Sequence, residues 1–237
     1  MEKLIIDHNL KLAMDPEDIL SSSLLTLYDY QPVTLSSAGS IFSFTSTAPD
    51  QTITKVTLRT PDTQAANWSL HASSVWAASR FLADHLHLLE LSKHTSQCSP
   101  GKRVKLLELG AAAGLPGILI AARNPQVSVT VSDYPDADLI RTLAENVAEN
   151  GVSANCRATP YAWGSRPSDL FLPDGEKFDM VIAADTLWNP EFHGIFVESL
   201  KLTLERTPQS RIHLFAGLHT GRYTIQSFLV RPFAFLS

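Results

Sequence analysis

From residue 104 onward, short apolar segments alternate with segments that have the length and spacing of helices. The apolar segments cover residues 104–109, 127–132, 178–184 and 212–217. Helices are predicted from Leu115, over 136–150, over 191–205 and from Thr220. Strands that alternate with helices indicate βαβ units, in which parallel strands form one sheet with helices on both faces. The sequence therefore predicts an α/β fold with a doubly wound sheet.

The first 74 residues have a different character and are predicted to form an N-terminal arm with a β-hairpin. Residues 41–45 and 53–58 alternate apolar and polar side chains around a Pro49-Asp50 turn, a pattern typical of a hairpin. A short helix is predicted over residues 16–28 of the arm. Residues 75–91 carry apolar side chains at helical spacing, so an amphipathic helix opens the second domain, residues 75–237.

Composition narrows the class of protein. Nineteen lysine and arginine residues against 24 aspartate and glutamate residues give a net charge of −5, which disfavours sequence-independent binding of nucleic acid. The two cysteines lack a CxxC spacing, so neither a disulfide scaffold nor a cysteine zinc site is expected. Neither a signal peptide nor a membrane span is predicted. We expect a cytoplasmic monomer.

A turn of small residues follows the first predicted strand. Residues 110–114 read Gly-Ala-Ala-Ala-Gly, and a helix begins at Leu115 or Pro116. Small residues let the backbone approach a ligand, and a helix N-terminus offers free N–H groups. Only Gly110 fits the dinucleotide fingerprint, whereas Glu108 followed by Gly-x-small-x-Gly resembles motif I of class I S-adenosylmethionine-dependent methyltransferases. Ala112 replaces the middle glycine of that motif, and a helix start without any ligand is the alternative.

Two carboxylates accompany this turn. Asp133 ends the second strand, 25 residues after Glu108, where a carboxylate can accept both ribose hydroxyls of an adenosyl ligand. Dehydrogenases share this feature, and Asp133 could instead cap the following helix. Glu108 lies in an apolar strand, where it either contacts the amino end of the cofactor or holds the glycine-rich turn in place.

Further motifs follow the later strands, and together they resemble the fungal elongation factor methyltransferase 7 family. They are Asp133-Tyr134-Pro135-Asp136, Trp163-Gly164, Ala184-Asp185-Thr186-Leu187-Trp188 and Gly217-Leu218-His219-Thr220-Gly221-Arg222. The resemblance covers residues 75–228. It implies a Rossmann-like class I methyltransferase fold, S-adenosylmethionine as cofactor and a protein substrate. That substrate is translation elongation factor 1-alpha, methylated at its N-terminal glycine and the adjacent lysine.

The resemblance also implies the site residues. Asp185 and Trp188 are the expected catalytic residues, the first orienting the amine and the second forming an apolar wall around it. Trp163 is placed to stack on adenine, an interaction worth about 1–3 kcal/mol. The expected cofactor-binding residues are Trp76, Glu108, Gly110, Ala111, Ala112, Gly114, Asp133, Trp163 and Ala184. Trp76 and Trp163 have an alternative interpretation as core aromatic residues.

Methyl transfer requires alignment of the reactants rather than a metal or a Ser-His-Asp triad, and neither is predicted. His193 follows the strand predicted over residues 178–184, and His219 follows the one over 212–217, so either could lie near the amine. His8, His71, His94 and His213 are assigned to solvent or packing.

The family's sheet continues with an antiparallel pair after the helix near Thr220, and little sequence remains there. Strands 6 and 7 of that sheet are therefore expected to be missing. Two other functions stay open: a small-molecule N-methyltransferase of the nicotinamide type, and a catalytically inactive scaffold.

Overall fold

The structure is a computed structural model of the chain, and it describes residues 33–98, 101–171 and 175–230. Residues from Val33 onward form one compact unit. The predicted helix over residues 16–28 lies outside the described residues, and the domain boundary at residue 74 stays a prediction. Among the described helices, none combines the length and apolar character that crossing a membrane requires.

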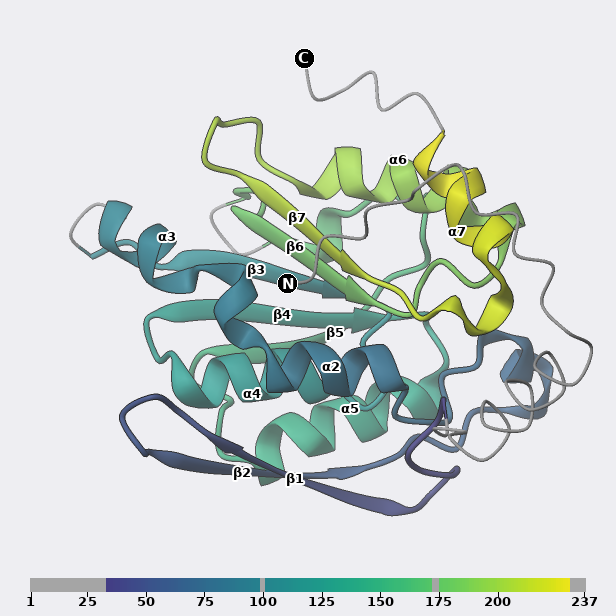
Figure 1. The fold of residues 1–237 in the computed structure, drawn as a ribbon, viewed down its shortest axis with the longest axis horizontal. Coiled ribbons are helices and arrows are strands. Elements are labelled where there is room, and N and C mark those ends of the chain that lie inside the picture. The colour runs from purple at the N-terminus through teal and green to yellow at the C-terminus, as the bar shows by residue number, and fades with distance from the viewer. Residues whose placement is uncertain (1–32, 99–100, 172–174, 231–237) are drawn as a thin grey trace, which may run out of the picture. The chain divides into compact units, whose positions relative to one another are not determined.

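Five parallel strands form the central sheet in the order β5-β4-β3-β6-β7 (Figure 1). They are β3 (Val104–Leu109), β4 (Val127–Asp133), β5 (Cys156–Pro160), β6 (Met180–Ala184) and β7 (Arg211–Phe215). The chain runs outward from β3 to β5 and then continues on the other side of β3. This order creates a topological switch point between β3 and β6, where open α/β sheets bind ligands beyond the carboxyl ends of their strands. The predicted doubly wound α/β fold is confirmed.

Helices cover both faces of the sheet, because alternate residues of each buried strand point to opposite sides. Leu106 belongs to an apolar cluster with α2 (Ala77–Asp84), α4 (Leu115–Arg123) and α5 (Ala137–Glu149). Leu107 and Leu109 belong to a second cluster with α6 (His193–Thr203) and α7 (Arg222–Leu229). Figure 1 shows these two groups of helices on opposite sides of the strands.

The predicted hairpin is present as β1 (Ile41–Thr47) and β2 (Ile53–Arg59), which pair antiparallel. Asn146 of α5 and Asn150, the C-cap residue of this helix, bind the edge of β2 that β1 leaves open. Asn150 accepts from the Thr57 amide at 3.0 Å and donates to its carbonyl at 2.8 Å. Asn146 accepts from the Arg59 amide at 2.8 Å and donates to its carbonyl at 2.9 Å. Asn146 also donates to the carbonyl of Ala113, at 3.0 Å, so it joins the hairpin to the glycine-rich turn.

The predicted helix over residues 75–91 is wrong in its length. It ends at Asp84, and the chain continues through the 3-10 helix η2 (Leu86–Leu89) into α3 (Leu91–Gln97). Glu90 between them has a left-handed φ of +49°. This break lets Leu89 and Leu91 both enter the core, whereas one continuous helix would point residues two apart in different directions.

Short 3-10 helices complete the fold and shape the loops at the ends of the strands. They are η1 (Ala65–Leu70), η3 (Ser168–Leu170), η4 (Pro190–Phe192) and η5 (Leu218–Thr220). Strands β1 and β2 form the hairpin, so β6 and β7 are the fourth and fifth strands of the central sheet in chain order. The expected absence of two further strands concerns the chain after α7, and residues 231–237 lie outside the described residues.

Candidate active site

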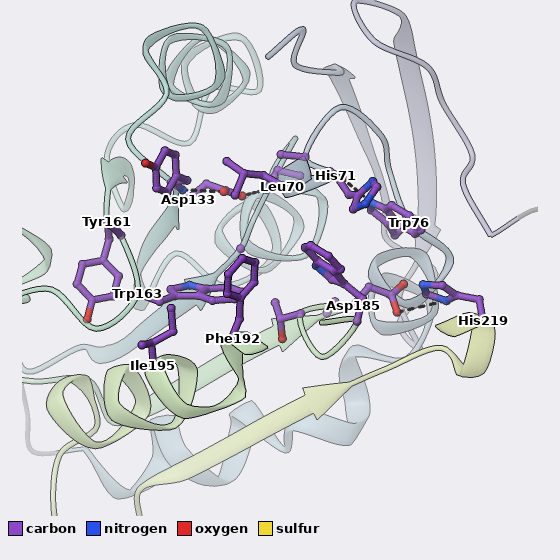
Figure 2. A pocket seen from close by; sticks show the side chains of 18 residues that line it. Leu70, His71, Trp76, Asp133, Tyr161, Trp163, Asp185, Phe192, Ile195 and His219 are labelled. Atoms are coloured by element: carbon purple, nitrogen blue, oxygen red, sulfur yellow. Dashed lines mark hydrogen bonds and ion pairs between the residues drawn. The ribbon is translucent and has the colours of Figure 1, made fainter. Parts of the chain in front are cut away.

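A cavity lies at the carboxyl ends of the five parallel strands (Figure 2). Its empty space, open solvent at the mouth included, is about 870 Å³. Side chains or backbone following all five strands contribute to it. The lining residues are Leu70, His71, Ala72, Trp76, Gly110, Ala112, Asp133, Tyr134, Tyr161, Ala162, Trp163, Ala184, Asp185, Thr186, Trp188, Phe192, Ile195 and His219.

The glycine-rich turn forms the floor of this cavity and requires its glycines. Gly110 and Gly114 have φ values of +68° and +85°, which side-chain-bearing residues rarely adopt. A Cβ on Gly110 would come within 2.8 Å of the Thr186 Cγ2 atom. A Cβ on Gly114 would come within 2.7 Å of Leu143 Cδ1, so this glycine lets α4 pack against α5. Of the two glycines, only Gly110 lines the cavity.

Backbone strain is concentrated around the cavity. Of the five non-glycine residues with positive φ in the described ranges, three line it: His71 at +54°, Ala112 at +48° and Asp185 at +57°. Such conformations cost about 1–3 kcal/mol each and persist where the surroundings hold them, often at functional sites. Ala112 occupies the middle-glycine position of the motif, and its amide donates to Asp133 Oδ2 at 2.7 Å.

Asp133 is the last residue of β4, and its carboxylate faces the turn. Its Oδ1 accepts from the Tyr134 amide at 2.7 Å. Burial raises the pKa of Asp133 to about 6, although the N–H groups of Ala112 and Tyr134 oppose the shift. Each carboxylate oxygen keeps a lone pair that can accept a ligand hydroxyl. The helix-cap alternative is wrong, because Asp136 caps α5 by accepting from the amides of residues 138 and 139.

Glu108 lies beneath the cavity rather than on its wall. It is 1% exposed, and its Oε2 accepts from the Gly117 amide of α4 at 2.8 Å. Burial raises the pKa of Glu108 to about 8, and the neighbouring Asp133 carboxylate adds to the shift. In this position Glu108 fixes the start of α4. Ala111 is likewise absent from the lining, and its amide donates to the Ser132 carbonyl at 3.0 Å.

One half of the cavity presents Trp163 beside Tyr161 and Ile195, which are labelled together in Figure 2. Trp163 packs at a tilt against Phe196 of α6, with 4.7 Å between ring centroids. Gly164 follows with a φ of +80°, and its amide donates to the Ser199 hydroxyl at 2.8 Å. These contacts hold the indole against one end of the cavity.

Five further rings line the cavity, and we call them the aromatic wall: His71, Trp76, Trp188, Phe192 and His219. His71 meets Trp188 edge to face at 4.8 Å and Trp76 at 6.1 Å. Trp188 meets Phe192 at 5.7 Å, and His219 stacks on Trp76 at 5.2 Å. The Trp76 indole N–H donates to the His71 carbonyl at 2.8 Å.

Asp185 connects three segments behind this wall. Its Oδ1 accepts from the Gly217 amide at 2.8 Å, and its Oδ2 accepts from the Ala78 amide at 3.1 Å, in the first turn of α2. His219 Nδ1 lies 4.0 Å from Asp185 Oδ1. The carboxylate therefore caps α2 from a distant part of the chain and holds the loop after β7 beside it.

The cavity includes residues that the sequence did not single out. His71, assigned to solvent or packing, lies in the aromatic wall because η1 brings it over the strand ends. The carboxylate of Asp136 positions η1 by accepting from the Gln64 amide and the Asn67 side chain. No local pattern marks His71, whereas Tyr134 and Thr186 sit beside predicted site residues and could have been inferred from that position.

The two histidines that could lie near the amine, His193 and His219, occupy different environments. His219 lines the cavity, whereas His193 does not. His193 is fully buried, with its Nε2 3.1 Å from the Leu187 carbonyl and its ring against Phe228. It packs the loop after β6 against α7.

Comparisons with known proteins identify the family. A family model described as lysine methyltransferase matches residues 62–225. A protein N-terminal and lysine N-methyltransferase efm7 of Schizosaccharomyces pombe is 33% identical over 120 residues, 48% of this chain and 47% of that protein. Its namesake in Gibberella zeae is 32% identical over 159 residues, 61% of this chain and 57% of that protein. These relatives confirm the resemblance seen in the motifs, and this chain spans about half the length of the curated relatives it matches.

Among solved structures, a glycopeptide N-methyltransferase, MtfA, complexed with S-adenosylmethionine superimposes with a TM-score of 0.36 at 18% identity, over 53% of this chain and 52% of that chain. The family match rests on sequence and covers most of the sheet, its helices and the cavity. The chain therefore belongs to the lysine methyltransferase family.

Proposed function

We propose that this chain is an S-adenosylmethionine-dependent protein N-methyltransferase. The observation that carries the proposal is the meeting of Asp133 and the Gly110 turn in one cavity at the carboxyl ends of the strands. A site for an adenosyl ligand needs both, and a sheet that placed them at opposite ends would have none. Membership of the lysine methyltransferase family supports the same reaction class.

The residues present fit the cofactor. Asp133 would accept the ribose hydroxyls, Trp163 would stack on adenine, and Gly110 would let the backbone approach the ligand. Within the described residues, the buried hydroxyl of Thr186 has no hydrogen-bond partner and lies on the lining, so it can serve a ligand atom. When bound, S-adenosylmethionine supplies a methyl group on a sulfonium.

The protein's own contribution is alignment and exclusion of water. Trp188 would form an apolar wall around the amine, which must be neutral when it attacks, and Trp76 would contact the cofactor. Asp185 accepts one backbone N–H group on each oxygen, which fixes its carboxylate at the cavity, and the remaining lone pairs would orient the amine. Glu108, Ala111 and Gly114 would support the cofactor site from beneath the turn, and Ala112 and Ala184 would line it.

For the substrate we propose translation elongation factor 1-alpha, at its N-terminal glycine and adjacent lysine, with the enzyme acting as a cytoplasmic monomer. The printed names of the relatives, protein N-terminal and lysine N-methyltransferase, support a protein substrate. The net charge of −5 is compatible with a basic peptide.

Two measurements test the proposal. Titration calorimetry should detect binding of S-adenosylhomocysteine, and its absence would favour an inactive scaffold. Transfer of radiolabelled methyl should then be followed into purified elongation factor 1-alpha and, separately, into nicotinamide. Label in the protein alone supports the proposal, whereas label in nicotinamide alone would establish the small-molecule alternative. Mass spectrometry of the N-terminal peptides of elongation factor 1-alpha, compared between normal cells and cells lacking this protein, would identify the methylated residues.

A further inference from the structure

A second hollow adjoins the cavity, and we call it the side groove. Its empty space, open solvent at its mouth included, is about 520 Å³. His71 and Trp76 line both hollows, and Figure 2 shows these two rings together at one end of the cavity. A ligand in the cavity can therefore extend past this pair into the side groove. The lining residues of the side groove are Ala38, Asp62, Trp68, His71, Ser73, Ser74 and Trp76.

Hydrogen bonds hold the side groove in shape without a ligand. The His71 amide donates to the Trp68 carbonyl at 3.0 Å, and the Trp76 indole N–H donates to the His71 carbonyl at 2.8 Å. On the same segment, the Ser73 hydroxyl lies 3.0 Å from the hydroxyl of Thr63, which is 4% exposed. The groove is therefore built by connected backbone and side chains.

The side chains of the groove favour a basic ligand. Among its described lining residues there is no lysine or arginine, and Asp62 supplies the one carboxylate. This carboxylate is exposed, and within residues 33–98, 101–171 and 175–230 it has neither an ion pair nor a hydrogen bond. Trp68 lines the same groove and leaves 67% of its surface exposed. A large exposed apolar side chain next to a binding site is typical of a contact surface for a partner.

An indole and a carboxylate on one groove suit a basic side chain. A guanidinium stacks on aromatic faces and pairs with a carboxylate through two N–H groups, and an ammonium makes weaker versions of both contacts. Consecutive Cα atoms of a polypeptide lie about 3.8 Å apart. A polypeptide whose amine enters the cavity therefore places a neighbouring side chain within reach of the groove.

We propose that the side groove binds a basic side chain of the polypeptide whose amine is methylated in the cavity. The inference rests on the proposed function, because it takes the occupant of the cavity to be a polypeptide. Asp62 and Trp68 then determine specificity without touching a reacting atom. The groove also favours a protein over nicotinamide, because nicotinamide has no side chain to place there.

A pair of probes tests the groove without any methyl transfer. The amides of Nα-acetyl-arginine and Nα-acetyl-citrulline have nearly the same shape but differ in charge. The chain has four tryptophans, so the indole N–H signals of the isotope-labelled full chain can be assigned by NMR, that of Trp68 through its loss in Trp68→Phe. The arginine probe should shift the Trp68 signal saturably, and the citrulline probe should bind about fivefold more weakly. Equal affinity for both probes, or a response at Trp188 without one at Trp68, would overturn the proposal.

Variants locate the charge. Asp62→Asn keeps the shape of the side chain and should bring the two probes to within about twofold of each other. Asp169→Asn is the matched control, because Asp169 is also exposed and lies outside both hollows, and it should keep the preference for arginine. An equal loss in both variants would reflect net charge alone and would contradict the assignment.

A second variant keeps the test valid if Asp62→Asn does not fold, which circular dichroism and the melting temperature check. Trp68→Leu removes the indole and should weaken binding of the arginine probe about fivefold, measured by saturation-transfer NMR. Unchanged binding in Trp68→Leu would refute the groove as the site.

Kinetics connect the groove to the substrate. With elongation factor 1-alpha as methyl acceptor, Asp62→Asn should raise KM about threefold to fivefold and keep kcat within about twofold, because the groove binds substrate and transition state equally. An unchanged KM, or a loss of kcat alone, would overturn the inference. S-adenosylhomocysteine binding without a response of Trp68 to arginine refutes the inference alone. A response of Trp68 without S-adenosylhomocysteine binding refutes the proposed function alone.

Discussion

Replacing Glu108 by glutamine should remove a pH-dependent loss of stability. The carboxylate is 1% exposed, and burial raises its pKa from the ordinary 4.5 to about 8. The native protein therefore keeps this proton to higher pH than the unfolded chain does. Because the native state binds more protons inside this window, the free energy of unfolding falls as pH rises from about 4.5 to about 8 and is level above it.

The size of the effect follows from the window. Each pH unit inside it costs about 1.4 kcal/mol. Asp133, with a pKa of about 6, titrates in the lower part, so Glu108 is the main contributor between about pH 6.5 and 8. The wild-type protein should lose about 2 kcal/mol there, or about 4–8 °C in melting temperature for a chain of this length. Glutamine keeps an acceptor for the Gly117 amide, and its buried NH₂ group costs about 1–3 kcal/mol at every pH.

Thermal unfolding across this pH range measures the slope, which the constant cost of the amide does not change. The wild type should lose melting temperature with rising pH, and Glu108→Gln should stay nearly level. Glu149→Gln, on the exposed surface of α5, is the matched control and should follow the wild type. Parallel slopes for the wild type and Glu108→Gln would refute the account of a carboxyl protonated by burial.

Three further changes test the site and its supports. Ala112→Gly should raise the free energy of unfolding by about 0.5–1 kcal/mol in urea denaturation, because glycine relieves the left-handed strain at φ +48° at some entropic cost. Asp133→Asn should weaken S-adenosylhomocysteine binding about 10- to 100-fold by calorimetry, since an amide replaces a charged acceptor. Asn146→Ala should cost about 2–4 kcal/mol, because the amide and carbonyl of Arg59 and the Ala113 carbonyl lose their partner; a loss below about 0.5 kcal/mol would show that water replaces it.

The central strands β3, β4 and β6 could be predicted because they are buried on both faces. Strand β3 is buried at every position and reads as an unbroken apolar run except for Lys105 and Glu108, a pattern typical of a central parallel strand. The end of the helix predicted over residues 75–91 could not be located, because the apolar spacing fits a continuous helix and a broken one almost equally. Tertiary packing decided between them by burying both Leu89 and Leu91.

The site was predictable to the extent that it follows strand ends. Asp133 ends β4, whereas Gly110, Trp163 and Asp185 follow β3, β5 and β6. The carboxyl ends of parallel strands meet at one edge of the sheet. His71 reaches the cavity because it follows η1, and η1 is held by hydrogen bonds to Asp136, about 70 positions further along the chain. Non-local contacts of this kind leave no periodic trace in the sequence, and neither does the engagement of Asp185 by backbone amides.

The asparagines of α5 give the hairpin a role in the architecture of the turn beneath the cavity. Asn146 and Asn150 lie four residues apart, and each gives β2 one donor and one acceptor, as a neighbouring strand would. This edge of β2 therefore cannot pair with a strand from another molecule. The Asn146 side chain also donates to the Ala113 carbonyl, so one residue bonds both the hairpin and the glycine-rich turn. Removing the hairpin would take away the two bonds to Arg59 that fix the Asn146 side chain beneath the turn.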